Sequence, residues 1–157
     1  MPAVASRVPL LATAAAAVAG AIASARAADF YQQLAQPTWA PPAAVFGPVW
    51  SVLYVLMALA AWLVVRTLGW PRARPAITLY VAQLALNALW PWIFFQWRLG
   101  GVALAEILVL WTLLLLTVLA FWRARRLAGL LLLPYLAWVG FAAALTWAVW
   151  QRNPQAL

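Results

Sequence analysis

The sequence contains no cysteine and no histidine, and its only acidic side chains are Asp29 and Glu106. Without cysteine, the chain cannot form disulfides, iron–sulfur clusters or a thiol nucleophile. Without histidine, it lacks the commonest metal ligand, the usual proton shuttle and the usual axial ligand of haem. Two carboxylates in one chain exclude a carboxylate-rich metal cage and a paired-acid hydrolase. The sequence therefore predicts no metal site and excludes most familiar enzyme classes.

Most residues of the chain are apolar. Of 157 residues, 69% are hydrophobic and 8% are charged, and the mean hydropathy is +0.95. A soluble domain of this length needs far more polar surface, so this composition indicates an integral membrane protein. The net charge of +8 comes from arginines that flank apolar runs. That placement is typical of membrane topology signals and argues against a nucleic-acid-binding face.

Five apolar runs are long enough to cross a bilayer, which takes roughly 20 residues. They cover residues 8–27, 46–65, 76–97, 102–122 and 130–150. A proline-rich loop, 28–45, follows the first run, and the other connections are short. Short connections make successive helices antiparallel neighbours. The sequence thus predicts an all-α integral membrane protein with a five-transmembrane-helix bundle, forming a single domain over residues 1–157.

The first run has two interpretations. Its basic start, apolar middle and small residues Ala25 and Ala27 are typical of a secretory signal with its cleavage site. Its small residues at every fourth position instead favour a retained helix that packs closely in lipid; they are Ala12, Ala16, Gly20 and Ser24.

The arginines predict an orientation. If five spans alternate, one side of the membrane receives Arg7, Arg66, Arg72, Arg74, Arg123, Arg125 and Arg126, and the other receives Arg26, Arg98 and Arg152. The positive-inside rule then places the N-terminus inside and the loop 28–45 on the outer face. The same bias favours the inner membrane of a bacterial cell over the outer membrane.

One narrow face of the third run carries two amides, a phenol and two aromatic rings: Tyr80, Gln83, Asn87, Trp90 and Phe94. At about 100° per residue these side chains fall within roughly 80°. Because amides are costly against lipid, this face should point into the bundle. It supports either interhelical hydrogen bonding or the wall of a ligand cavity.

Two other runs also turn aromatic residues inward. The second carries Trp50, Tyr54, Met57 and Ala61 on one face, and the fifth carries Trp138, Phe141, Ala142 and Leu145. A fully packed bundle has little room for so many large rings, which favours a cavity for a flat, largely apolar ligand. Glu106, early in the fourth run, is interpreted as a structural ion pair, with Arg98 as one candidate, or as a substrate or proton site.

Three motifs support a resemblance to a known family. "LAQPTWAPPAAVFGPVWSVLY", "LYVAQLALNALWPWIFF" and "PYLAWVGFAAALTWAVWQRN" occur in this order along the chain. They resemble the first loop with the start of the second helix, the third helix and the fifth helix of the TspO/MBR family. This is the family of translocator proteins, tryptophan-rich sensory proteins and peripheral-type benzodiazepine receptors. The resemblance implies a bacterial member with a retained first helix, a five-helix bundle and a homodimer.

The resemblance also implies a function. Family members bind tetrapyrroles such as protoporphyrin IX and haem, sterols and drug-like ligands in a pocket capped by the first loop. Positions matching its pocket motifs are Trp39, Trp50, Asn87, Trp90, Trp138, Ala142 and Leu145; the inward faces add Tyr54, Gln83, Phe94 and Phe141. Pro41 and Pro42 are expected to stiffen the lid.

Three functions stay open at this point. The first is a membrane receptor or transporter that binds its ligand by stacking and polar edge contacts and needs no cofactor. The second is an enzyme-like breakdown of protoporphyrin that depends on light and oxygen, with Trp50 and Trp138 as candidate electron donors. The third is a structural or regulatory membrane partner whose cavity is incidental.

Overall fold

The computed structural model describes residues 7–157, so residues 1–6 of the predicted domain lie outside the described part. Its α-helices are α2 (Arg7–Ala23), α3 (Ala27–Gln33), α4 (Phe46–Leu68), α5 (Trp70–Pro91), α6 (Gly100–Ala124) and α7 (Arg126–Arg152). A 3-10 turn, η1 (Ala43–Val45), precedes α4, and a π-helix, η2 (Trp92–Gln96), follows α5. Residues 7–157 contain no β-strand, and the predicted all-α fold class is confirmed.

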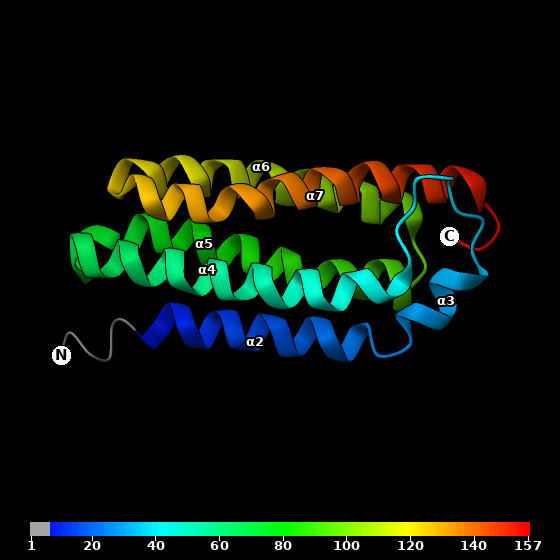
Figure 1. Cartoon of the computed structure of the whole chain (residues 1–157), viewed down its shortest axis with the longest axis horizontal. Coiled ribbons are helices and arrows are strands. Elements are labelled where there is room, and N and C mark those ends of the chain that lie inside the picture. Colours follow the sequence, from blue (N-terminus) through cyan, green and yellow to red (C-terminus); the bar gives the residue numbers. More distant parts are fainter. Residues whose placement is uncertain (1–6) are drawn as a thin grey trace.

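The long helices run side by side in layers (Figure 1). The pair α6 and α7 lies on one side of α4 and α5, and α2 lies on the other, packed against α5 and α4. The bundle is built on large buried side chains from four helices, among them Met57, Tyr80, Phe121 and Tyr135. The inward orientation predicted for the α5 face is confirmed, since Tyr80, Gln83 and Asn87 are all buried.

Four segments are long and apolar enough to cross a membrane, namely Ala43–Leu68, Trp70–Gln96, Gly100–Ala124 and Arg126–Arg152. The helices α2 and α3 form a fifth span if they are taken together, but they are bent by 50°. The predicted helix over 8–27 is therefore too long, and the predicted loop 28–45 is partly helical. The backbone carbonyl of Ala23, at the end of α2, accepts a hydrogen bond of 2.7 Å from Gln96 Nε2. A partner so distant in sequence leaves no local signal for this break.

Two connections are much shorter than predicted. The expected loop 66–75 reduces to Gly69, whose φ of 73° suits a glycine after a helix end. Pro71 stands in the first turn of α5, where a helix tolerates proline well. The expected loop 123–129 reduces to Arg125, which has an extended backbone between α6 and α7. Helical geometry therefore continues beyond the hydrophobic runs from which the span ends were predicted.

Pro91 ends α5, and the chain continues as the π-helix η2. The wider winding appears in the hydrogen bond from the Trp97 amide to the Trp92 carbonyl, 2.8 Å long. This segment places Phe94 and Phe95 at one end of the bundle, where they pack edge to face with centroids 5.1 Å apart.

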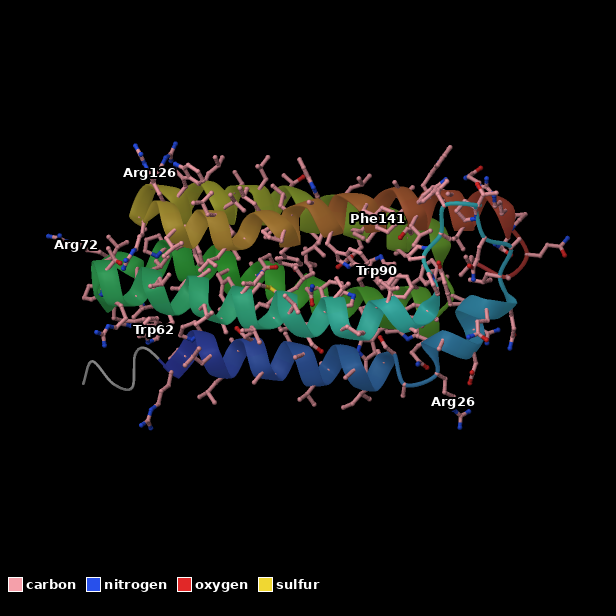
Figure 2. The ribbon with its side chains drawn as sticks, viewed as in Figure 1. Arg26, Trp62, Arg72, Trp90, Arg126 and Phe141 are labelled. Atoms are coloured by element: carbon pink, nitrogen blue, oxygen red, sulfur yellow. The ribbon has the colours of Figure 1, made fainter. Side chains whose placement is uncertain are left out.

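The ends of the bundle differ in charge, as the alternation of spans predicted. Figure 2 shows Arg72 and Arg126 at one end and Arg26 at the opposite end. The second end also carries α3 and the C-terminus (Figure 1). The loop that follows α3 therefore lies at the arginine-poor end.

Candidate ligand cavity

A cavity of about 540 Å³ lies between the helices near the arginine-poor end. This volume falls within the range of about 300–1,000 Å³ that is usual for small-molecule sites. Every long helix contributes to the wall, together with α3, η1 and η2. The cavity is therefore a product of the whole bundle.

Aromatic rings form much of the wall. Trp50 comes from α4, Trp90 from α5 and Trp138 from α7, and Phe94 is stacked on Trp90 at 4.9 Å between centroids. The Trp90 indole N–H donates to the Ala103 carbonyl at 3.2 Å, which fixes its ring against α6. Tryptophan rings held in this way offer flat apolar faces to a ligand.

A chain of hydrogen bonds closes the deep side of the cavity. Tyr54 Oη donates to Asn87 Oδ1 at 2.6 Å, and Asn87 Nδ2 donates to Tyr135 Oη at 2.7 Å. Tyr135 Oη then donates to Gln83 Oε1 at 2.8 Å. Tyr54 and Asn87 line the cavity, whereas Tyr135 and Gln83 lie behind them. Most hydrogen-bond donors and acceptors at this wall are already paired within the protein, so few remain for a ligand.

Small residues of α2 and of the turn that follows it form another part of the wall. Ala17, Gly20, Ala21 and Ser24 line the cavity, and a Cβ at Gly20 would stand 3.6 Å from Tyr54 Oη. The ridge predicted to allow close helix packing thus has a second role that sequence reasoning missed. Its small residues at Gly20 and Ser24 leave volume beside the aromatic rings.

Most of the predicted ligand-binding residues meet at this cavity. Those that line it are Trp50, Tyr54, Asn87, Trp90, Phe94, Trp138, Ala142 and Leu145. Gln83 does not line the cavity; it is fully buried and accepts a hydrogen bond from Tyr135. Trp39 and Phe141 also lie outside the wall and contact each other edge to face at 5.8 Å. Their binding of a ligand stays a prediction.

Three aromatic residues of the wall were not predicted: Tyr31, Phe46 and Phe95. Phe46 precedes Trp50 by four residues, so helical periodicity carried a signal for it. Tyr31 lies in a segment interpreted as loop, where no periodicity was sought. Phe95 enters the wall because η2 is wound as a π-helix, which changes which side chains share a face.

The segment 34–42, called the lid segment below, is held at both ends. Tyr31 Oη donates to the Pro41 carbonyl at 3.1 Å. At the other end, Asn153 Oδ1 accepts from the Ala35 amide and Asn153 Nδ2 donates to the Ala35 carbonyl, each at 2.9 Å. The predicted stiff prolines Pro41 and Pro42 do not line the cavity. Asn153 was missed, because nothing local marks the end of α7 as the partner of a residue so far along the chain.

Glu106 does not form the predicted ion pair with Arg98. Both carboxyl oxygens of Glu106 are buried, and neither has a hydrogen-bond partner among the described residues. The Arg98 guanidinium instead lies over the ring of Phe30, 4.6 Å from its centroid. The carboxyl is left without a counter-charge.

Helices of membrane-spanning length around an internal aromatic cavity define an integral membrane protein with a ligand-sized site. The chain belongs to the TspO/MBR family, whose profile matches residues 8–151. It is 41% identical to the human translocator protein over 126 residues, which cover 79% of this chain and 75% of that protein. It is 39% identical to the tryptophan-rich protein TspO of Chlorobaculum tepidum over 127 residues, or 80% of each chain.

A third relative is the tryptophan-rich sensory protein of Cereibacter sphaeroides, with 38% identity over 125 residues, covering 80% of this chain and 77% of the relative. The sequence-based family resemblance is thus confirmed. Membership supports a membrane receptor- or transporter-like role.

The contact between Asn153 and Ala35 yields a prediction about the lid segment. Replacing Asn153 with Ala removes both hydrogen bonds to Ala35. We expect amide hydrogen exchange across residues 34–42 to speed up by about 5- to 150-fold, from a net value of about 0.5–1.5 kcal/mol for each of the two hydrogen bonds. The matched control is Gln151→Ala, an exposed residue two positions earlier. Equal exchange in Asn153→Ala, Gln151→Ala and wild type would show that Asn153 does not hold the lid segment.

Proposed function

We propose that the cavity binds planar, largely apolar ligands of the tetrapyrrole class, such as protoporphyrin IX and haem, and that the protein is a membrane receptor or transporter for them. The observation that carries this proposal is the wall itself, in which Trp50, Trp90 and Trp138 from three helices line one cavity of about 540 Å³. Flat conjugated ligands gain most from stacking on such rings. The few polar groups in the cavity wall suit a macrocycle whose two faces are largely apolar.

Binding by stacking has a consequence for iron. The residues that most often ligate haem iron, histidine and cysteine, are absent from the sequence. In this proposal the macrocycle is held by its faces and edges. Metal-free protoporphyrin IX then binds about as tightly as haem.

The arginine distribution supports an orientation for this receptor. The arginine-poor end, with the lid segment and the cavity, belongs on the outer face of a bacterial inner membrane under the positive-inside rule. A ligand then reaches the cavity from the outer side by way of the lid segment.

A substitution that fills the cavity tests the binding proposal. Ala142 lines the cavity on α7, and Ala142→Phe would place a ring in the space that a macrocycle needs. We expect affinity for protoporphyrin IX, measured by tryptophan quenching in lipid vesicles, to fall at least about tenfold, or about 1.4 kcal/mol. The matched control is Ala144→Phe, which adds the same ring at an exposed position of the same helix.

Two results would contradict the proposal. One is equal affinity of Ala142→Phe and Ala144→Phe for protoporphyrin IX. The other is a strict requirement for iron, with haem binding and metal-free protoporphyrin not binding. Thermal unfolding of both variants in detergent separates a filled cavity from a misfolded bundle.

A second candidate function is light- and oxygen-dependent degradation of protoporphyrin. The observation in its favour is that both candidate electron donors, Trp50 and Trp138, line the cavity where a macrocycle would stack. An indole in contact with the photoexcited macrocycle can donate one electron to it, and oxygen takes up that electron as superoxide. The indole radical cation then takes an electron back from the macrocycle, and the macrocycle radical cation combines with superoxide, so that both oxygen atoms enter the product and the indole is restored. No acid–base pair is required for that chemistry.

The rate of protoporphyrin bleaching under light tests this second function. We expect Trp138→Phe and Trp50→Phe each to slow bleaching several-fold at saturating protoporphyrin. Trp147→Phe is the matched control, because Trp147 lies on the same helix as Trp138 but is 56% exposed and outside the cavity. Unchanged bleaching in both cavity variants would remove the degradation function and leave binding untouched.

A further inference from the structure

The carboxyl group of Glu106 is enclosed by the bundle. Both of its oxygens are inaccessible to solvent and without a hydrogen-bond partner among residues 7–157. Glu106 lies in the second turn of α6, which starts at Gly100. The cavity is lined by Ile107 and Leu110, which follow Glu106 by one and four positions on α6. Glu106 thus lies on the stretch of α6 that contributes to the cavity wall, although its own side chain does not line the cavity.

The groups around Glu106 offer no counter-charge. The elements packed against α6 are α7, α5, η2 and α4, and η2 carries no titratable residue. The other three carry the buried or half-buried phenols Tyr135, Tyr80 and Tyr54.

The cations on those elements sit at the ends of their helices: Arg66, Arg72, Arg74, Arg126 and Arg152. At the end nearest Glu106, Arg152 Nη1 donates to the Ala148 carbonyl at 2.9 Å, and Arg98 lies over Phe30. Both are engaged elsewhere. An ionised carboxylate buried without a cation is costly, so the neutral acid is the stable form here.

We propose that Glu106 is a proton-binding site coupled to the cavity. It is protonated while the cavity is empty or holds an uncharged ligand. When a planar cation binds, Glu106 loses its proton and becomes the counter-ion. The ligand class that this site selects is a flat aromatic cation, which includes a tetrapyrrole protonated on a ring nitrogen. The counter-ion role rests on the proposed binding function, whereas the protonated state of the empty protein does not.

The coupling has a physical basis in the wall. Opposite charges in a region of low dielectric attract strongly even across several ångströms. The polar groups Tyr54 and Asn87 at the cavity are hydrogen-bonded onward to the buried phenol of Tyr135 on α7, the helix that packs against α6. Gln83, which accepts from Tyr135, keeps an unused buried donor at Nε2. On ionisation the carboxyl O–H bond breaks and its proton passes to water, one proton for each positive charge bound.

Infrared spectroscopy tests the protonation state without any ligand. The full chain in vesicles of ether-linked lipids, which have no ester carbonyl, should show at neutral pH the C=O stretch of a protonated carboxylic acid. With only two acidic side chains in the sequence, the band can be assigned with two variants. We expect it to persist in the control Asp29→Asn, where Asp29 is exposed, and to vanish in Glu106→Gln. Absence of the band in wild type, or its survival in Glu106→Gln, would overturn the proposal.

A matched pair of probes tests the counter-ion role. N-methylacridinium carries a fixed positive charge, and 9-methylanthracene is its uncharged counterpart of nearly the same shape. In wild type we expect the affinity for the cation to rise with pH by up to about tenfold per pH unit, the limit for one released proton. The affinity for 9-methylanthracene should not change with pH. In Glu106→Gln, both affinities should be independent of pH.

Each other outcome is informative. A pH-independent affinity for the cation in wild type, or the same pH dependence in Glu106→Gln, would exclude Glu106 as the counter-ion. If neither probe binds, the proposed binding function and the counter-ion role fall together. The infrared band then still decides, by itself, whether Glu106 holds a proton in the empty protein.

Discussion

The Asn87 side chain joins three helices, and the site depends on that junction. Its amide oxygen accepts from Tyr54 of α4, and its amide nitrogen donates to Tyr135 of α7. Between helices in lipid there is little hydrophobic driving force, so packing and such hydrogen bonds decide how the helices meet. Beyond the junction, toward the arginine-rich end, the bundle is filled by side chains such as Tyr80 and Phe121, stacked at 5.7 Å. Toward the arginine-poor end, it opens into the cavity.

The junction also sets the chemistry of the cavity. Because Asn87 is hydrogen-bonded to both Tyr54 and Tyr135, the wall formed by Tyr54 and Asn87 offers little hydrogen bonding to a ligand. Affinity must then come from the faces of Trp50, Trp90 and Trp138, and space for a ligand comes from small residues such as Gly20 and Ala142. Glu106 is the acid whose carboxyl is buried on α6 next to the wall residue Ile107. In the proposals above, stacking gives the site its preference for flat molecules, and Glu106 gives it a preference among their charge states.

The sequence predicted the features that repeat along one helix. Apolar runs of bilayer length gave the spans, and a period of 3.6 residues placed Asn87, Trp90 and Trp138 on inward faces. It failed where a distant residue decides the structure. The break after Ala23 depends on Gln96, and the position of Ala35 depends on Asn153. Gln83 is buried as predicted but does not line the cavity, because its side chain accepts a hydrogen bond from Tyr135 inside the bundle.

The most direct test of the central claim is a double-mutant cycle on Asn87→Leu and Tyr135→Phe, with unfolding in detergent and binding of metal-free protoporphyrin IX both measured. We expect each single substitution to destabilise the bundle by about 1–2 kcal/mol, and the pair to cost clearly less than the sum. Asn87→Leu should also weaken protoporphyrin binding. Thr112→Val, at an exposed hydroxyl bonded only to its own helix, should change neither quantity. Additive stability losses with unchanged binding would contradict the claim that this junction shapes the cavity.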